Sequence, residues 1–329
     1  MSLLRKGLAA ASAGILALGL TACGDSSASD GGSSGSSEGG LISIIVNDPS
    51  NPYWLAEGNV AGAEAKKLGY ESKVSAHKGD TKTESNLVDT AITNQSAAII
   101  LDPANADGSI GAVRRAVDAE IPVFLINAEI NEQGLAQTQL VSNNAQGAAL
   151  GAQRWAEQMG GEGKYVELLG APSDNNAATR SNGFKTVLSQ YPDLEKVGQE
   201  VANWNRQEGH TKMQTLLQAH PDITGVISGN DEMALGAIAA LKDAGKLDEV
   251  VVGGFDGSPD AVDAVKAGDL DYTVLQPVAE FAKKAVQMAD QYLKTGETGA
   301  SAEKQSFDCT LITEENADQI TSPFILGGS

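Results

Sequence analysis

The 329-residue chain contains little cysteine, histidine or positive charge. Its two cysteines, Cys23 and Cys309, cannot provide a disulfide framework. Its three histidines, His77, His210 and His220, are scattered rather than set at the spacing of metal ligands, so we predict neither a metal site nor a cofactor. With 23 basic and 43 acidic residues the formal net charge is −20, which repels nucleic acid and excludes it as an expected partner.

Sequence motifs of the common enzyme classes are also missing. The chain has no GxSxG, no HExxH, no P-loop, and no GxGxxG after its first predicted strand. Cys309 lies in a strand-like run, Ser306–Ile312, where a small packing residue is expected rather than a nucleophile. We therefore predict that the protein is not an enzyme.

The first residues are typical of a bacterial lipoprotein signal peptide. Arg5 and Lys6 precede an apolar run that is shorter than the ~20 residues a membrane span needs. Small residues then lead to Cys23 in a Leu-Thr-Ala-Cys sequence, which resembles the lipobox. We predict that residues 1–22 are removed and that lipid on Cys23 anchors the protein to the cell membrane, outside the cytoplasm.

Residues 23–40 are almost entirely glycine, serine and acidic residues. Such a segment cannot bury enough apolar surface to fold, so we expect a flexible linker between the lipid anchor and a globular body.

After residue 40, short apolar runs alternate with amphipathic helical windows. The runs are continuous rather than alternating, which is typical of strands buried on both faces of a parallel sheet. The same alternation of apolar runs and helical windows begins again in the second half of the chain. This pattern predicts an α/β fold with two doubly wound parallel-sheet lobes. The predicted strands are Leu41–Val46, Ser72–Ala76, Ala97–Leu101, Val123–Ile126, Lys164–Leu169, Lys196–Val201, Gly225–Ser228, Val250–Phe255 and Tyr272–Leu275.

Polar and aromatic side chains follow these strands, where α/β sheets bind ligands. Amides and carboxylates can hydrogen-bond several hydroxyls, and aromatic faces can pack on the C–H face of a sugar, so a small neutral sugar or sugar alcohol is the expected ligand. Any one of the Asn and Asp residues can instead be a helix N-cap or turn residue. The candidate ligand-binding residues are Asn47, Asn51, Tyr53, Trp54, Asp102, Asn127, Asp174, Asn175, Trp204, Asn230, Asp256 and Gln276.

Four segments together resemble the periplasmic ribose-binding protein family, the pentose and hexose binders of ABC importers, which are related to the ligand domain of LacI-type repressors. These segments are Asn51–Trp54, Ala219–Asp222, Asn230–Ala237 and Val252–Gly257. The resemblance covers about residues 41–320 and implies the type I periplasmic binding protein fold, a monomer that closes on its sugar and docks on an ABC permease.

The resemblance also implies a three-crossover hinge and particular sugar contacts. The crossings are expected near Ser142–Asn144, Gln276–Pro277 and Asp308, which gives an N-terminal lobe of residues 41–142 plus 277–307 and a C-terminal lobe of residues 143–276 plus 308–326. The implied contacts are Asn51, Tyr53, Trp54, Trp204, Asn230, Asp256 and Gln276, with Asn47 and Asp102 at further cleft positions.

The chain departs from the ribose binders where they carry arginine. They have Asp-Arg where this chain has Asn127–Ala128, and a further Arg where Ala178 stands. Arg180 aligns with a second Arg of that loop and is expected to be structural, while Asp174 and Asn175 are candidate substitutes. A buried hydroxyl without a partner costs about 1–3 kcal/mol. We therefore favour an acyclic polyol of four to six carbons or an unusual pentose or hexose, with ribose or another common pentose or hexose as the alternative.

Proteins of this fold also have two other roles. A transcriptional regulator of this fold needs an N-terminal helix-turn-helix, and this chain has a signal peptide there instead. A receptor that presents its sugar to a chemosensor or sensor kinase, rather than to a permease, remains an alternative that the sequence does not separate from transport.

Overall fold

The structure is a computed structural model that describes residues 39–327. The predictions for residues 1–22, for Cys23 and for nearly all of the linker lie outside this range. Among the described residues, no helix combines the length and the apolar composition that crossing a membrane requires.

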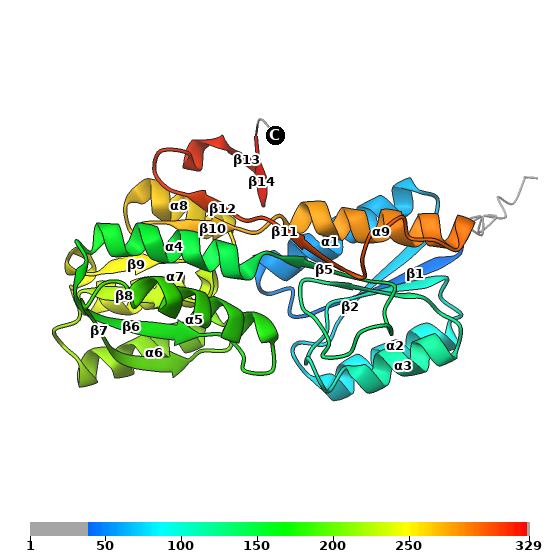
Figure 1. Cartoon of the computed structure of the whole chain (residues 1–329), viewed down its shortest axis with the longest axis horizontal. Coiled ribbons are helices and arrows are strands. Elements are labelled where there is room, and N and C mark those ends of the chain that lie inside the picture. The colour runs from blue at the N-terminus through cyan, green and yellow to red at the C-terminus, as the bar shows by residue number, and fades with distance from the viewer. Residues whose placement is uncertain (1–38, 328–329) are drawn as a thin grey trace, which may run out of the picture. The chain divides into compact units, whose positions relative to one another are not determined.

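The first sheet has six strands in the order β11-β5-β4-β3-β1-β2, and every neighbouring pair is parallel. Helices α1 and α9 cover one face and α2 and α3 the other (Figure 1). The bounds are β1 Leu41–Val46, α1 Pro52–Lys67, β2 Glu71–Ala76, α2 Thr81–Thr93, β3 Ala98–Leu101, α3 Ile110–Asp118, β4 Val123–Ile126, β5 Thr138–Ser142, α9 Val278–Thr295 and β11 Lys304–Phe307.

The second sheet has four parallel strands in the order β7-β6-β8-β9. An antiparallel pair, β10 with β12, extends it through isolated bridges such as Gly253 with Tyr272. The bounds are α4 Asn144–Gln158, β6 Glu162–Leu169, α5 Asn175–Leu188, β7 Asp193–Val201, α6 Arg206–Ala219, β8 Gly225–Ser228, α7 Asp231–Asp243, η1 Leu247–Glu249, β9 Val251–Gly253, α8 Pro259–Ala267, β10 Thr273–Leu275 and β12 Thr310–Ile312.

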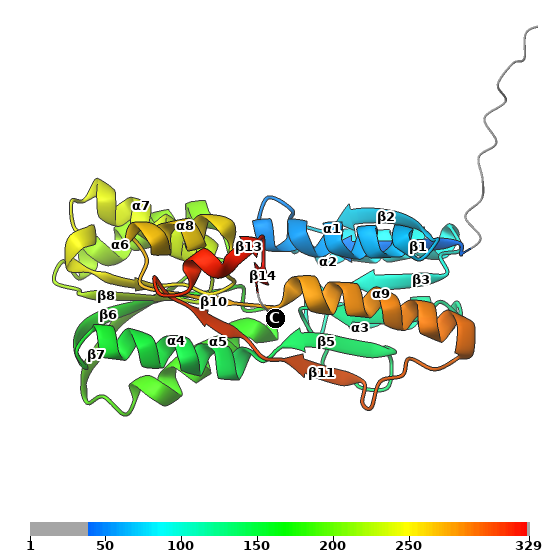
Figure 2. The same cartoon turned by 90° about the horizontal axis from the view of Figure 1, so that it is seen from above.

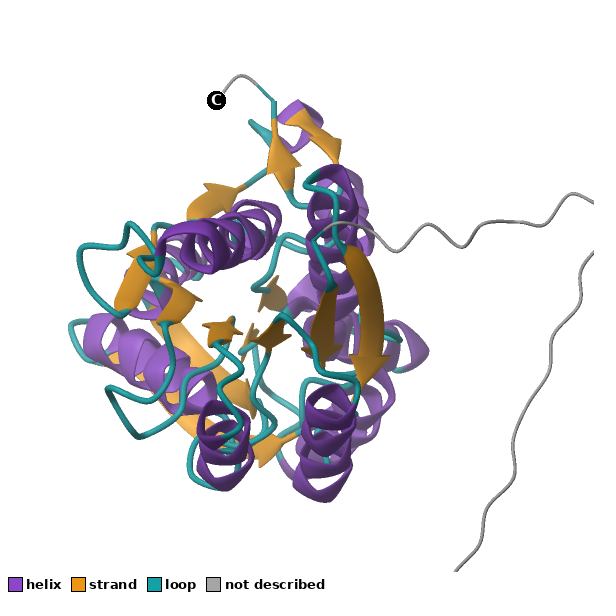
Figure 3. Cartoon of the chain, turned by 90° about the vertical axis from the view of Figure 1, so that its right-hand side faces the viewer, coloured by secondary structure: helices purple, strands orange, loops and turns teal. Residues whose placement is uncertain are grey.

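The chain passes between the two sheets three times, and Figure 2 shows the three connections side by side. They join β5 to α4, β10 to α9, and β11 to β12. The two parallel sheets and these three crossings confirm the predicted fold class. Figure 3 shows the helices arranged around the strands.

Two strand predictions fail for physical reasons. The run Ser306–Ile312 is not one strand, because the chain leaves the first sheet at Phe307 and enters the second at Thr310. Strand β5 was not predicted, since Thr138 and Gln139 interrupt its apolar pattern. Both are nonetheless buried, because β5 lies between β4 and β11.

The chain ends in a short hairpin that follows β12. A single 3₁₀ turn, η2 Ala317–Gln319, leads into strand β13, Ile320–Ser322, which pairs antiparallel with β14, Ile325–Leu326. In Figures 1 and 2 this hairpin lies beside the N-terminal end of α9.

Candidate functional site

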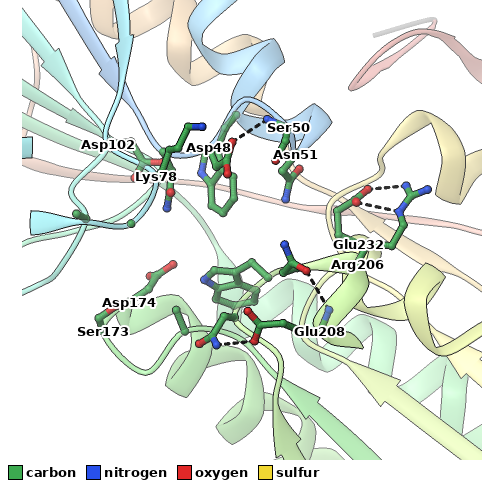
Figure 4. Close-up of a pocket in the computed structure, with 18 of the residues that line it drawn as sticks. Asp48, Ser50, Asn51, Lys78, Asp102, Ser173, Asp174, Arg206, Glu208 and Glu232 are labelled. Atoms are coloured by element: carbon green, nitrogen blue, oxygen red, sulfur yellow. Dashed lines mark hydrogen bonds and ion pairs between the residues drawn. The ribbon is translucent and has the colours of Figure 1, made fainter. Parts of the chain in front are cut away.

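Two adjoining pockets lie where loops from the carboxyl ends of strands in both sheets meet. The outer pocket has a volume of about 570 Å³ and the inner one about 20 Å³. They share Asn51 and Trp54 from the first sheet's loops, and Asp174 and Trp204 from the second's. Figure 4 shows labelled side chains converging on the outer pocket from both sheets. Ligands bind at this edge in α/β folds.

Eleven of the twelve candidate residues line one pocket or both. The outer pocket is lined by Asn47, Asn51, Trp54, Asp102, Asp174 and Trp204, and the inner one by Asn51, Tyr53, Trp54, Asn127, Asp174, Trp204, Asn230, Asp256 and Gln276. Asn175 lines neither. Its Nδ2 donates to Asn131 Oδ1 at 2.9 Å, which ties the start of α5 to the loop after β4. That these residues bind a ligand remains a prediction.

Three of these residues are also helix N-caps. Asn51, Asp174 and Asn230 each accept a hydrogen bond from a backbone N–H of the helix that follows, at 2.9, 2.8 and 3.0 Å respectively. N-capping satisfies one of the helix's free donors. For the two asparagines the cap uses the amide oxygen and leaves the Nδ2 group free of the cap. The two interpretations offered by the sequence are therefore compatible at the same residue.

Three residues of the inner pocket have positive backbone φ values. They are 62° at Asn127, 63° at Trp204 and 135° at Asp256. Such conformations cost of order 1–3 kcal/mol in residues other than glycine and cluster at functional sites. Contacts with the surrounding chain must therefore hold these three residues in place.

Hydrogen bonds link the pocket residues of the first sheet to those near the second crossing. Asn127 Nδ2 donates to Asp102 at 3.0 Å, and the Tyr53 hydroxyl donates to Asn127 Oδ1 at 3.0 Å. The same hydroxyl lies 3.4 Å from Gln276 Oε1, and Gln276 Nε2 donates to Asp256 at 2.6 Å. The site is thus one connected set of donors and acceptors.

Arg180 closes this set into a ring. Its guanidinium donates to Asp256 at 3.3 Å and to Asn144 Oδ1 at 2.7 Å. Asn144 in turn donates to Asn176, whose Nδ2 returns to the Asn127 carbonyl at 3.1 Å. Arg180 and Asn176 line the inner pocket, and the sequence reasoning missed both as pocket residues.

The Arg180 guanidinium is held in place by two aromatic rings. It lies 3.9 Å from the centroid of Phe255 and 5.2 Å from that of Trp204, and the residue is only 3% exposed. Cation–π contacts of this kind are strongest where water is excluded. No sequence pattern reveals this placement, because the two rings come from separate loops.

Trp204 lines both pockets. Its Nε1 has no hydrogen-bond partner among the described residues although the atom is buried. A buried donor of this kind costs free energy unless something accepts from it. Gly170 makes room for the indole, since a Cβ at that position would collide with the ring. Trp204 therefore gives both pockets an aromatic lining residue, and its Nε1 is a buried donor without a partner among the described residues.

Burial raises the pKa of several carboxyl groups around the site. The pKa of Asp256 rises to about 8 because of desolvation, which Arg180 partly offsets and the charge of Asp231 reinforces. Desolvation also raises the pKa values of Asp102 and Glu57 well above the ordinary range. The nearby charge of Asp102 raises the pKa of Glu57 further. The site and its surroundings therefore carry less negative charge than their composition suggests.

The rim of the outer pocket is charged. Arg206 forms a bidentate pair with Glu232 at 2.9 and 2.7 Å and also bonds Asp260 at 2.7 Å. Across the opening lies Lys78 (Figure 4). Within residues 39–327, no group of His, Cys, Asp and Glu is arranged to hold a metal ion.

Fold and site together define a two-lobed α/β binding protein, with a polar, aromatic-lined site at the junction of its sheets. Residues 42–298 match the family model for the periplasmic binding protein domain. The chain belongs to this family.

Similar proteins agree with this assignment. The D-apiose import binding protein of Paraburkholderia graminis is 50% identical over 280 residues, covering 85% of this chain and 89% of that protein. The ribose import binding protein of Salmonella typhimurium is 32% identical, covering 83% and 90%. A solute-binding protein of Bacillus halodurans, crystallised with myo-inositol, is 28% identical with a TM-score of 0.79, covering 86% and 98%.

These findings identify the protein as an extracytoplasmic solute-binding protein of an ABC sugar importer. It is not an enzyme. The predicted resemblance to the ribose-binding family is confirmed.

Proposed function

We propose that this chain is a lipid-anchored binding protein that captures a neutral pentose, D-apiose foremost, between Trp54 and Trp204 and delivers it to a membrane permease. The observation that carries the proposal is the hydrogen-bonded ring from Asp102 through Asp256 to Arg180, set beside the unpartnered Nε1 of Trp204. The 50% identity to a D-apiose import binding protein supports the choice of sugar.

The chemistry of the site suits an uncharged polyhydroxylated ligand. Each hydroxyl is both donor and acceptor, so amide and carboxyl groups can bind it from either side. Asp256 supplies an acceptor or, when protonated, a donor. One guanidinium, that of Arg180, is available even though Ala128 and Ala178 replace two arginines of the ribose binders.

The proposed mechanism is hinge closure about the three crossings. The lobes we propose are residues 41–142 plus 277–307 and residues 143–276 plus 308–326. A ligand that contacts both lobes only in the closed form shifts the population toward that form. The closed form then docks on the permease, and no bond of the sugar is made or broken.

A calorimetric screen tests the ligand. We expect D-apiose to bind with the highest affinity in a panel that includes D-ribose, xylitol and myo-inositol, with glutamate and phosphate as charged controls. A ligand at a hundred times its Kd adds about 2.7 kcal/mol to stability, so a thermal shift is a second readout. Binding of the charged controls alone would contradict the proposal.

A lipid-labelling experiment tests the anchor. In a bacterial host supplied with radiolabelled palmitate, the full chain should incorporate label and fractionate with membranes. The Cys23→Ala variant should do neither. Equal labelling of both chains would contradict lipidation at Cys23.

A further inference from the structure

The C-terminal hairpin brings one large apolar side chain to the binding site. Phe324 lies in the two-residue turn between β13 and β14 and is only 3% exposed. Its ring meets that of Tyr53 edge to face, with centroids 5.7 Å apart and an interplanar angle of 89°. Tyr53 lines the inner pocket, so a residue 271 positions later in the chain packs behind a site residue.

The backbone of this turn is strained at Phe324, the residue whose ring is buried. Phe324 has a φ of 61° and follows Pro323, and a turn with proline at its first central position and positive φ at the second normally carries glycine there. Phenylalanine in this conformation is strained. The strain is maintained because the ring is buried against its neighbours.

The hairpin approaches Tyr53 from the opposite lobe. Before it, η2 packs on α8, where Ala317 is fully buried and Lys266 pairs with Asp318 at 3.4 Å. Helix α8 packs on α7 and β10 in the second lobe, whereas Tyr53 begins α1 on the first. The Phe324–Tyr53 contact therefore spans the junction of the lobes outside the three crossings.

Tyr53 contacts a second aromatic ring besides Phe324. Trp54 meets it edge to face at 6.5 Å, and its hydroxyl lies between Asn127 and Gln276 in the hydrogen-bonded ring. A shift of the Tyr53 ring would therefore move the hydroxyl away from Asn127 and Gln276 together. Phe324 packs against the Tyr53 ring, so it limits movement of that ring on the side where the two meet.

We propose that Phe324 is a positioning residue that fixes Tyr53 in the sugar-binding site and couples the C-terminal hairpin to ligand affinity. This inference rests on the proposed function, because it takes Tyr53 to be part of the site. It adds a residue that influences ligand affinity although it does not line either pocket.

A double-mutant cycle tests the proposal. Phe324→Ala should weaken D-apiose binding about tenfold by calorimetry, which is within the range of coupling between contacting residues. In a Tyr53→Phe background, which lacks the hydroxyl, Phe324→Ala should cost less than twofold further. Full additivity of the two changes would overturn the inference.

Two companion variants separate positioning from turn strain and general stability. Phe324→Gly relieves the positive φ but removes the ring, and it should lose affinity as Phe324→Ala does. Phe324→Tyr keeps the ring and should restore most of the affinity. Ile325→Ala, at a neighbouring position that is 46% exposed, is the matched control and should bind as wild type. Wild-type affinity in Phe324→Gly would contradict the proposal.

A ligand-free measurement keeps this test independent of the sugar. The chain has six tyrosines, and 3-fluorotyrosine labelling with a Tyr53→Phe variant assigns the Tyr53 signal. That signal should shift or broaden in Phe324→Ala and not in Ile325→Ala. An unchanged signal overturns the inference. If wild type binds no sugar of the panel, the proposed function fails and the fluorine signal alone decides whether Phe324 positions Tyr53.

Discussion

Some residues at the site have two structural roles. Asn230 caps α7 through its oxygen, while its Nδ2 lies 3.4 Å from the Trp204 carbonyl at the pocket edge. Asp256 accepts from both Gln276 and Arg180 despite its strained backbone. Because the same side chains cap helices and line the pocket, the proposed ligand contacts are held in place before a ligand arrives, which lowers the entropic cost of binding.

Truncating Trp204 should remove a large part of the binding free energy. We expect Trp204→Ala to cost about 2 kcal/mol or more, or roughly thirtyfold in Kd, since buried aromatic anchors dominate binding energies. Calorimetry with D-apiose measures this. Trp155, which is buried between α4 and the second sheet away from both pockets, provides a contrast. Trp155→Phe should retain the affinity.

The raised pKa of Asp256 predicts how stability depends on pH. In the unfolded chain this carboxyl ionises near its ordinary value of about 3.9, whereas the folded protein keeps the proton up to about pH 8. Its stabilising contribution is therefore full at low pH and is lost as pH rises toward 8. Asp256→Asn, which cannot ionise, should gain thermal stability relative to wild type between pH 6.5 and 8.5.

The matched control for this change is Asp263→Asn, since Asp263 is an exposed residue of α8. Its melting temperature should follow wild type across the same range. His77 does not confuse the comparison, because burial lowers its pKa and its effect on stability falls below pH 6.5. A constant offset between Asp256→Asn and wild type at every pH would argue against a protonated Asp256.

At the scale of elements, strand ends set the positions of the site residues. The loop that follows β6 begins with Gly170, and the Trp204 indole from the loop after β7 lies directly over it. Parallel neighbours β6 and β7 bring the two loops to the same edge. Because Gly170 has no side chain, the loop after β6 leaves the space that the Trp204 ring occupies.

Adding one methyl group at Gly170 should disturb the site without unfolding the protein. In Gly170→Ala the new Cβ displaces the Trp204 ring, so we expect at least a tenfold loss of affinity and a loss of stability of about 1–3 kcal/mol, typical of overpacking. Gly111→Ala in α3, where the space is open, is the control and should bind normally. Unchanged binding in Gly170→Ala would show that Trp204 is not a ligand contact.

Much of the site could be predicted because its signals are local. Apolar runs followed by Asn, Asp or Gln identified the strand ends, and eleven of the twelve candidates line the pockets. Asn175 is among the candidates because it follows Asp174 in the loop after a predicted strand. The first turn of the helix instead directs Asn176 inward and Asn175 toward Asn131. One residue of sequence thus changes which way a side chain points.

At the scale of the whole molecule, individual hydrogen bonds join the lobes beyond the three crossings. The Asn175 side chain bonds Asn131 at 2.9 Å, and the backbone N–H of Ala106 donates to the Ser173 carbonyl at 3.1 Å. Such hydrogen bonds are worth about 0.5–1.5 kcal/mol each. The proposed shift between open and closed forms is therefore within reach of a single ligand.

Removing one of these contacts should favour the open form. We expect Asn175→Ala to weaken sugar binding about two- to fivefold, because part of the binding free energy must then close the lobes. Small-angle scattering should show a smaller radius of gyration on addition of D-apiose in both chains, with more sugar needed for the variant. Asn182→Ala, on the outward side of α5, should behave as wild type.

The sequence by itself determined the alternation of strands and helices, the two-sheet α/β class and the edge at which polar residues gather, because periodicity and capping act over a few residues. Only the tertiary structure decided that Arg180 lies between Phe255 and Trp204, and that Phe324 packs on Tyr53. These contacts join segments far apart in the chain. They follow from how the lobes and the C-terminal hairpin pack together, which no local pattern of residues encodes.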